Sequence, residues 1–427
     1  MTMPVPRAYR RGENGLEWNQ TSCPYKERKM EFIIKLDRFL ILLLIASVVA
    51  ILTRRLRVPY SVGLVFAGII LALFPLFSGI PFTKDLIFNV FLPPLVFEAA
   101  IHISWKELRK EFILVLILAT IGVCLSAAVT AVGMRYAAGW EWISALLFGA
   151  LIAATDPVSV VATFKEAGVH SRISLLVETE SLLNDGTAAV AFAVVLATAV
   201  GRSPTISGIA GTLALTVAGG VLCGALVVGV ILLLARRTGD NLVEFTLSTV
   251  VAYGSFLIAE HFHFSGVLAT LTAGILVGNL GLRQAGAARI REAITAYWEY
   301  LGFLANSFIF IGIGVQVSLQ NFKSVLLPAI IAILLVLLGR AFAVYPCCAL
   351  FGRSALRVQS KHQLILFWGG LRGALALALA VGLPDWVPNR ETIISVTFAV
   401  VAFSVFVQGL SMTPLLRCIG EIAPTDH

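Results

Sequence analysis

The stretch Glu180-Ser181-Leu182-Leu183-Asn184-Asp185-Gly186 interrupts an apolar run that extends from about residue 173 to residue 200. It places two carboxylates, a hydroxyl and a carboxamide in a run long enough to cross a bilayer as a helix. Ionisable groups at that depth are costly and usually mark the path of an ion or a proton. The stretch therefore predicts ion transport, provided that the rest of the chain is a membrane protein.

The composition of the whole chain indicates a membrane protein. Of its 427 residues, 58% are hydrophobic and only 13% are charged, and the mean hydropathy is +0.91. Soluble domains carry about 25% charged residues. The net charge of +8 fits basic cytoplasmic loops better than nucleic-acid binding, because no basic-aromatic patch accompanies it. We expect an all-α polytopic membrane protein.

Thirteen apolar segments are long enough to be spanning helices. Short loops join them, so we expect a polar N-terminal extension at residues 1–35, one transmembrane unit at 36–417 and a short cytoplasmic tail at 418–427. The segments cover approximately residues 36–53, 58–77, 84–103, 112–137, 142–164, 173–200, 207–235, 242–262, 265–282, 297–319, 324–351, 362–383 and 391–416.

Lysine and arginine set the expected orientation. They gather in the loops after the odd-numbered segments, for example Arg54, Arg55 and Arg57 after the first and Arg236 and Arg237 after the seventh, and they are sparse after the even-numbered segments. The positive-inside rule then places the N-terminus outside and the C-terminus in the cytoplasm. The basic residues between positions 26 and 38 disagree with this orientation, but the later loops alternate consistently.

Segments five and twelve contain residues that interrupt a helix. Pro157 in Thr155-Asp156-Pro157 removes a backbone donor and disfavours helical geometry at Asp156. Gly369-Gly370-Leu371-Arg372-Gly373 combines three glycines with an arginine. Because the two segments are seven apart and an odd offset inverts topology, segments 1–6 and 8–13 are expected to be inverted repeats. Paired interruptions in such repeats indicate a transport site near the membrane midplane.

Helical spacing groups the polar residues of segment six. Glu180 and Asn184 are four residues apart, as are Ser181 and Asp185, so each pair shares a face. Carboxylate, hydroxyl and carbonyl oxygens are the ligands that a hard cation such as Na⁺ prefers. A carboxylate buried there can hold a proton or a cation in turn, and that competition suffices for cation–proton exchange.

The break in segment five could complete this site. If segments five and six meet there, Asp156 and Thr155 could join Asp185 and Ser181 around one Na⁺ ion. For Thr155, Ser181 and Asn184, a purely structural role as hydrogen bonds between helices remains open. For the two aspartates it is disfavoured, because structure alone seldom requires two carboxylates at such depth.

Arg372 needs an acidic partner at its expected depth. Glu98 in segment three and Glu180 are the candidates. A buried arginine–carboxylate pair is expected to clamp the broken helix rather than to move with the ion.

Several classes of function lack their sequence signatures in this chain. There is no phosphate-binding glycine loop and no serine nucleophile elbow, so we expect neither a bound nucleotide nor an enzyme. The six cysteines show no metal-ligand spacing, and His261 and His263 lack the further ligands of a tetrahedral site. We therefore expect no cofactor and no nucleic-acid partner. The expected partners are the lipid bilayer, a monovalent cation and protons.

The ordered motifs resemble those of the Na⁺/H⁺ antiporters of the NhaP/NHE branch. The resemblance is carried by residues 155–157, 180–186 and 369–374, by 92–98 in segment three and by 265–274 in segment nine. It covers roughly residues 36–416. It implies the NhaA/NhaP-like antiporter fold, with crossing broken helices, a mobile core domain, a dimerisation domain and a homodimer in a prokaryotic plasma membrane.

The same resemblance implies roles for individual residues. Asp185 would exchange the cation for a proton by alternating access, and the Asn184-Asp185 pair resembles the electroneutral branch, which exchanges one cation for one proton. A K⁺/H⁺ exchanger, a broadly selective monovalent cation exchanger and a passive cation channel are the alternatives. By the same resemblance, Asp156, Thr155 and Ser181 would complete the site around Na⁺. Glu180 would assist through water or hydrogen bonding, and Arg372 would pair with Glu98.

Overall fold

The computed structural model describes residues 24–56, 58–74, 83–167, 169, 171–200, 206–235, 240–281 and 288–421. The chain divides into two units, Met1–Leu44 and Ile45–His427, and the candidate site lies in the second. All regular structure in the described residues is helical. The predicted all-α class is therefore confirmed.

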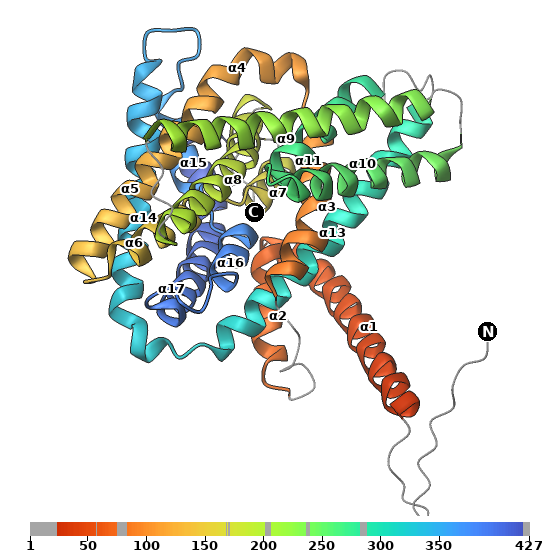
Figure 1. The fold of residues 1–427 in the computed structure, drawn as a ribbon, viewed down its shortest axis with the longest axis horizontal. Helices are drawn as coiled ribbons and strands as arrows, with labels where there is room; N and C mark the ends of the chain where they lie inside the picture. The colour runs from red at the N-terminus through yellow and green to blue at the C-terminus, as the bar shows by residue number, and fades with distance from the viewer. Residues whose placement is uncertain are drawn as a thin grey trace, which may run out of the picture. The chain divides into compact units, whose positions relative to one another are not determined.

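The helices follow the predicted apolar segments closely (Figure 1). Short π-helical turns adjoin α3, α4, α11 and α17 at Leu86–Phe91, Leu118–Gly122, Val277–Gly281 and Ser404–Gly409. In chain order the α-helices are α1 (Pro24–Leu56), α2 (Tyr60–Leu71), α3 (Leu92–His102), α4 (Trp105–Ile117), α5 (Val123–Ala137), α6 (Trp142–Ala153), α7 (Val158–Ala167), α8 (Ser171–Ala199), α9 (Ile206–Ala235), α10 (Asn241–His261), α11 (Gly266–Leu276), α13 (Ala288–Leu319), α14 (Phe322–Leu350), α15 (Ser360–Trp368), α16 (Ala374–Val381), α17 (Arg390–Phe403) and α18 (Leu410–Cys418).

Eight helical stretches of the described residues are long and apolar enough to cross a membrane. They are Phe39–Leu56, Trp105–Ala137, Arg172–Ala199, Gly211–Leu234, Leu242–His261, Arg291–Leu319, Phe322–Leu350 and Arg390–Cys418. Tyr60–Leu71, Leu86–His102, Trp142–Ala153 and Gly266–Leu280 are shorter apolar helices. Each of the thirteen predicted segments coincides with one of these stretches or with the interrupted pair α15 and α16, while the number of crossings stays a prediction.

The two predicted terminal segments are only partly described. Residues 1–23 of the expected polar extension lie outside the described residues, and residues 24–35 are helical because α1 begins at Pro24. At the other end α18 ends at Cys418, and residues 422–427 of the expected tail lie outside the described part.

The helices of the second unit pack in two groups. One group contains α2, α3, α10, α11 and α13, in which α13 packs on α2 and α3, and α11 on α3 and α10. The other contains α4, α5, α6, α8, α14, α16 and α17. Helix α9 packs on α10 and α11 and also on α8, so it touches both groups (Figure 1). The groups also meet where α16 contacts the π-helical turn before α3.

Each group has its own buried core. In the first, the rings of Phe97 and Trp298 lie 4.4 Å apart, and the Trp298 indole N–H donates to Ser248 Oγ at 3.1 Å. In the second, Phe164 and Ile365 belong to an apolar cluster formed by α4, α7, α8, α14, α15 and α18. Burial of such side chains fixes the helices that carry the polar site.

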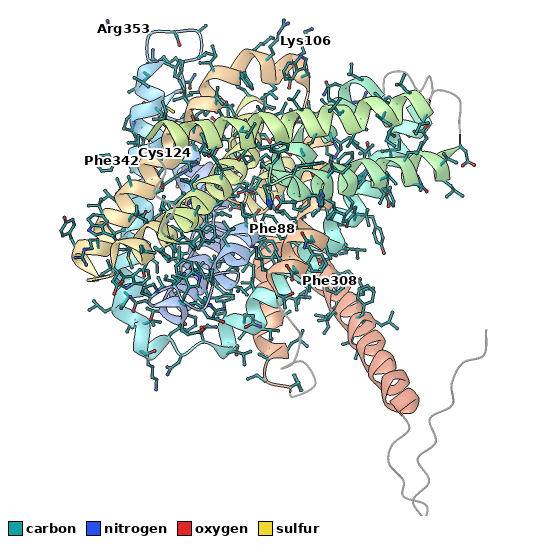
Figure 2. All side chains as sticks on the ribbon, viewed as in Figure 1. Phe88, Lys106, Cys124, Phe308, Phe342 and Arg353 are labelled. Carbon is teal, nitrogen blue, oxygen red and sulfur yellow. The ribbon has the colours of Figure 1, made fainter. Side chains whose placement is uncertain are left out.

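Apolar side chains also remain exposed on the outside of the bundle. Phe342 on α14 is 50% exposed, and Cys124 on α5 is exposed beside it in the view of Figure 2. Exposed apolar faces of this kind are expected where helices contact the lipid bilayer. Lys106 and Arg353, from two loops predicted to be cytoplasmic, both lie at the upper edge of the same view, as expected if they share one face of the membrane.

The chain after α18 is tied to the start of α15. Glu421 Oε1 lies 2.6 Å from Lys361 Nζ and 3.1 Å from His362 Nε2. The hydrogen bond from Lys361, assisted by His362, holds the pKa of the Glu421 carboxyl below its usual value. This contact fixes the end of α15 that is farther from the break at residues 369–373.

Candidate ion site

Two interrupted helices cross in the second unit, as the resemblance implies. The chain is non-helical at residues 154–157, between α6 and α7, and again between α15 and α16. At the crossing the Asp156 backbone N–H donates to the Leu371 carbonyl at 2.8 Å. The Arg372 backbone N–H donates to Ser404 Oγ at 2.8 Å. These bonds satisfy backbone groups that have no partner within the interrupted helices. Broken helices are tolerated inside a membrane protein only when such groups are satisfied.

Asn184 holds helix α8 against the break after α6. Its Oδ1 accepts the Thr155 backbone N–H at 3.0 Å, and its Nδ2 donates to Thr155 Oγ1 at 2.8 Å and to Glu180 Oε1 at 3.2 Å. Thr155 Oγ1 also lies 2.7 Å from Ser181 Oγ. The hydrogen-bonding role that the sequence left open is therefore present for Thr155, Ser181 and Asn184. Thr155 lines the cavity described below, whereas Ser181 is not among its lining residues.

Glu180 forms a buried ion pair that the sequence reading missed. Its two oxygens accept from Arg340 NH1 at 2.7 Å and NH2 at 2.9 Å, and the two side chains are only 1% and 8% exposed. Arg340 also donates to the Leu366 carbonyl at 2.9 Å, next to the second break. The lone arginine in the middle of segment eleven was the available signal, the same one that singled out Arg372. Both Glu180 oxygens are thus paired with Arg340, and Glu180 is linked to the site by the hydrogen bond from Asn184, while its role as an ion ligand stays a prediction.

Arg372 does not form the predicted pair with Glu98. Its NH1 donates to the Ala153 and Ala154 carbonyls at 2.7 and 3.1 Å, at the C-terminal end of α6. The interruption before Pro157 leaves these carbonyls without helical partners, and a helix C-terminus favours a cation. Glu98 instead has His102 Nε2 at 3.7 Å on the same helix. Arg372 thus joins the two broken helices through backbone carbonyls, and its Nε has no hydrogen-bond partner among the described residues.

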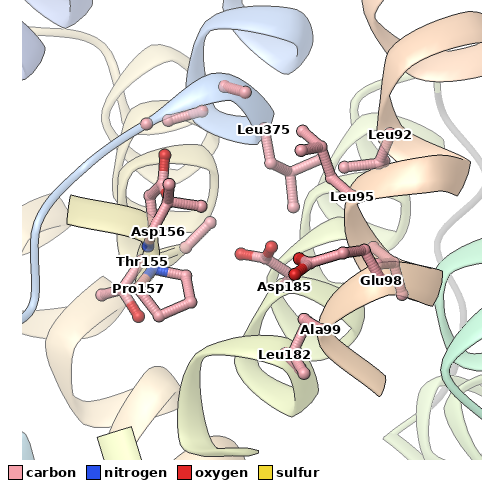
Figure 3. Close-up of a pocket in the computed structure, with 16 residues that line it drawn as sticks. Leu92, Leu95, Glu98, Ala99, Thr155, Asp156, Pro157, Leu182, Asp185 and Leu375 are labelled. Carbon is pink, nitrogen blue, oxygen red and sulfur yellow. The ribbon is translucent and has the colours of Figure 1, made fainter. Parts of the chain in front are cut away.

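Three carboxylates line one small cavity beside the crossing (Figure 3). Its volume is about 60 Å³, room for about two waters. Asp156 and Asp185 line it from the crossing and from α8, and Glu98 faces them from α3. The walls around them are largely apolar, with Leu92 and Leu375 among the lining residues.

Asp185 is the least satisfied of these groups. Its Oδ1 is buried and has no hydrogen-bond partner among the residues that the structure describes. Asp156, by contrast, accepts the Val158 N–H at 2.9 Å through Oδ1, and its other oxygen lies against Gly373. A buried oxygen without a partner is costly in an apolar wall. A cation or a proton on Asp185 would remove that cost, and only one of the two can do so at a time.

Comparisons with known proteins point to one family. A family model described as "Sodium/hydrogen exchanger, transmembrane" matches residues 42–418. The chain is 36% identical over 395 residues to the Na⁺/H⁺ antiporter ApNhaP of Aphanothece halophytica, covering 91% of this chain and 75% of the relative. It is 34% identical over 354 residues to the Na⁺/H⁺ antiporter NhaP of Pseudomonas aeruginosa, covering 80% and 83% of the two chains.

A solved structure has a similar fold. The sodium proton antiporter MjNhaP1 of Methanocaldococcus jannaschii at pH 8 superposes with a TM-score of 0.73 over 91% of this chain and 100% of that one. The sequences are 22% identical, so this likeness concerns the fold.

Proposed function

The chain belongs to the sodium/hydrogen exchanger family, and on that premise we propose that it exchanges Na⁺ for H⁺ by secondary active antiport. The family consists of transporters, and its named relatives are Na⁺/H⁺ antiporters. The observation that carries the proposal is the partnerless Oδ1 of Asp185 in a cavity between two crossing broken helices. Asp185 is the group that binds Na⁺ and the proton in turn. Asp156 is a second ligand, Thr155 adds an oxygen from the cavity lining, and Ser181 contributes through its hydrogen bond with Thr155.

We propose one-for-one, electroneutral exchange. Two neighbours of Asp185 on α8 support this stoichiometry: Asn184 is neutral and its amide is bound to Thr155 and Glu180, while Glu180 is neutralised by Arg340. One carboxylate that changes partner moves one proton against one cation. The crossing helices alternate the access of this site between the two faces of the membrane.

The setting of the site is part of the proposal. We expect a homodimer in a prokaryotic plasma membrane, with the N-terminus outside and the C-terminus in the cytoplasm. The alternation of basic loops supports the orientation, and the bacterial and archaeal relatives support the membrane.

Transport in proteoliposomes tests the proposal. With an inward-acid pH gradient, external Na⁺ is expected to dissipate the gradient, and at a rate that does not change when the membrane potential is clamped at different values. Substituting K⁺ or Li⁺ for Na⁺ measures selectivity. Equal rates with K⁺ would favour the broader exchanger. A current at fixed potential without proton movement would instead identify a channel.

Gly373→Ala is expected to slow exchange about 10- to 100-fold, because a displacement of about 1 Å at a reacting group has an effect of that order. A Cβ at residue 373 would collide with the Asp156 carboxylate, which must then move out of its place in the cavity. Initial rates of Na⁺-driven proton flux in proteoliposomes measure the effect. Gly211→Ala on α9 is the matched control, since a Cβ there meets open space. Equal rates for both variants would show that the position of Asp156 is unimportant.

A further inference from the structure

A second, larger cavity lies one helical turn from the Asp185 cavity. Its volume is about 480 Å³. Three helical segments line both cavities at a spacing of four residues: Leu92 at the start of α3 and Phe88 in the π-helical turn before it, Asp185 and Ala189 on α8, and Leu375 and Leu379 on α16. Four residues are about one turn, or about 6 Å. The second cavity therefore continues the first along the same three walls, toward the C-terminal end of α16.

Lys84 is one of the residues that line this second cavity. Its ammonium lies 5.9 Å from the centre of the Phe88 ring, which is labelled in Figure 2. Its aliphatic stem is in contact with Gly382, just after α16, so closely that a Cβ on Gly382 would collide with Lys84 Cδ. One exposed side chain from the segment before α3 thus contacts the residue that follows α16, and both segments line the second cavity.

Two negative groups lie near Lys84. The C-terminal end of α16 carries the negative pole of the helix. The Glu260 carboxylate is held at the start of α11, where its Oε1 accepts the Gly266 N–H at 3.0 Å, and it lies within electrostatic reach of Lys84 and His263. Lys84, Glu260 and His263 all line the second cavity. Lys84 therefore lines the cavity with the negative pole of α16 and the Glu260 carboxylate nearby.

We propose that the second cavity is an access route to Asp185 and that Lys84 is the latch that keeps it narrow. The latch holds the end of α16 against the segment before α3, one of the places where the two helix groups meet. That Na⁺ uses this route rests on the proposed antiport, whereas the latch itself does not depend on it. An exposed contact of this kind is weak, so thermal motion can open it during each cycle.

Cysteine labelling tests the latch without requiring transport. Ala193 on α8 is exposed and lines the second cavity, so Ala193→Cys reports on its opening. In detergent, a bulky hydrophilic maleimide is expected to label this cysteine about three- to fivefold faster when Lys84→Ala is added, as expected for the loss of one weak contact. The chain without Ala193→Cys gives the background from its native cysteines.

Two further variants separate charge from packing. Lys84→Met keeps the stem and removes the charge, and Gly382→Ala displaces the stem while leaving the charge in place. Both are expected to speed labelling, whereas Lys323→Met, which removes an exposed lysine in the first turn of α14, is expected to leave it unchanged.

The outcomes for the latch and for antiport are independent. Unchanged labelling in Lys84→Ala and in Gly382→Ala would overturn the latch, even if the protein exchanges Na⁺ for H⁺ normally. Faster labelling in a chain that exchanges no Na⁺ would leave the latch in place and overturn the proposed function instead.

Discussion

Asp185→Asn is expected to reduce Na⁺-driven proton exchange by more than about 100-fold, to the level of empty vesicles. Removing the charged partner of a buried ion costs on the order of 3–5 kcal/mol, and about 1.4 kcal/mol corresponds to a tenfold change in affinity. The amide also cannot take up and release a proton in the physiological range. One substitution therefore removes both halves of the exchange. Initial rates in proteoliposomes at saturating Na⁺ measure the loss.

The fold should survive this substitution. Asparagine has the shape of aspartate, and Asp185 Oδ1 makes no hydrogen bond to the described residues that the amide would break. We expect the thermal unfolding midpoint of Asp185→Asn in detergent to equal or exceed that of the wild type. Asp156→Asn is the informative comparison. It should retain weak exchange, because Asp156 is only a second ligand and Asp185 is still present. Substantial exchange by Asp185→Asn together with none by Asp156→Asn would reverse the two roles.

Arg340→Ala is expected to lower the free energy of unfolding by about 3–5 kcal/mol, the usual cost of breaking a buried ion pair from one side. It leaves the Glu180 carboxylate, 1% exposed, without its partner, and it leaves the Leu366 carbonyl without a donor. Denaturant unfolding in detergent measures the change. Arg417→Ala, at an exposed arginine near the end of α18, is the matched control and should change stability little.

A double-mutant cycle isolates the pair. Glu180→Ala combined with Arg340→Ala should be clearly more stable than the sum of the single effects predicts, since no unpaired charge remains buried. Strict additivity would mean that the two side chains do not stabilise each other. Recovery of stability without recovery of exchange would show that the pair also positions Asn184 and Thr155, which Glu180 contacts through Asn184.

The helices and their interruptions could be predicted because they depend on local chemistry. Apolar length locates the membrane segments, and Pro157 and the glycines after Trp368 locate the breaks. That the breaks cross was implied by the resemblance to the antiporter family. The structure bears this out in the hydrogen bond between Asp156 and Leu371.

The partners of the buried charges could not be predicted in the same way. Sequence shows that Arg372 needs compensation but not that the carbonyls released at residues 153 and 154 provide it. Glu98, the predicted partner, faces the cavity from another helix. Arg340 was overlooked although it is as isolated in its apolar segment as Arg372, and it takes the carboxylate of Glu180. Which acceptor a buried guanidinium finds depends on helix packing, which spacing along the chain does not encode.

The most direct test of the account is the proton release that Na⁺ causes in the purified protein. In weakly buffered detergent solution, adding Na⁺ to the wild type is expected to release one proton for each Na⁺ bound, as Asp185 exchanges one for the other. Asp185→Asn, folded to the same extent, should release none. Proton release of equal size from Asp185→Asn, or Na⁺ binding to the wild type without any release, would contradict the account.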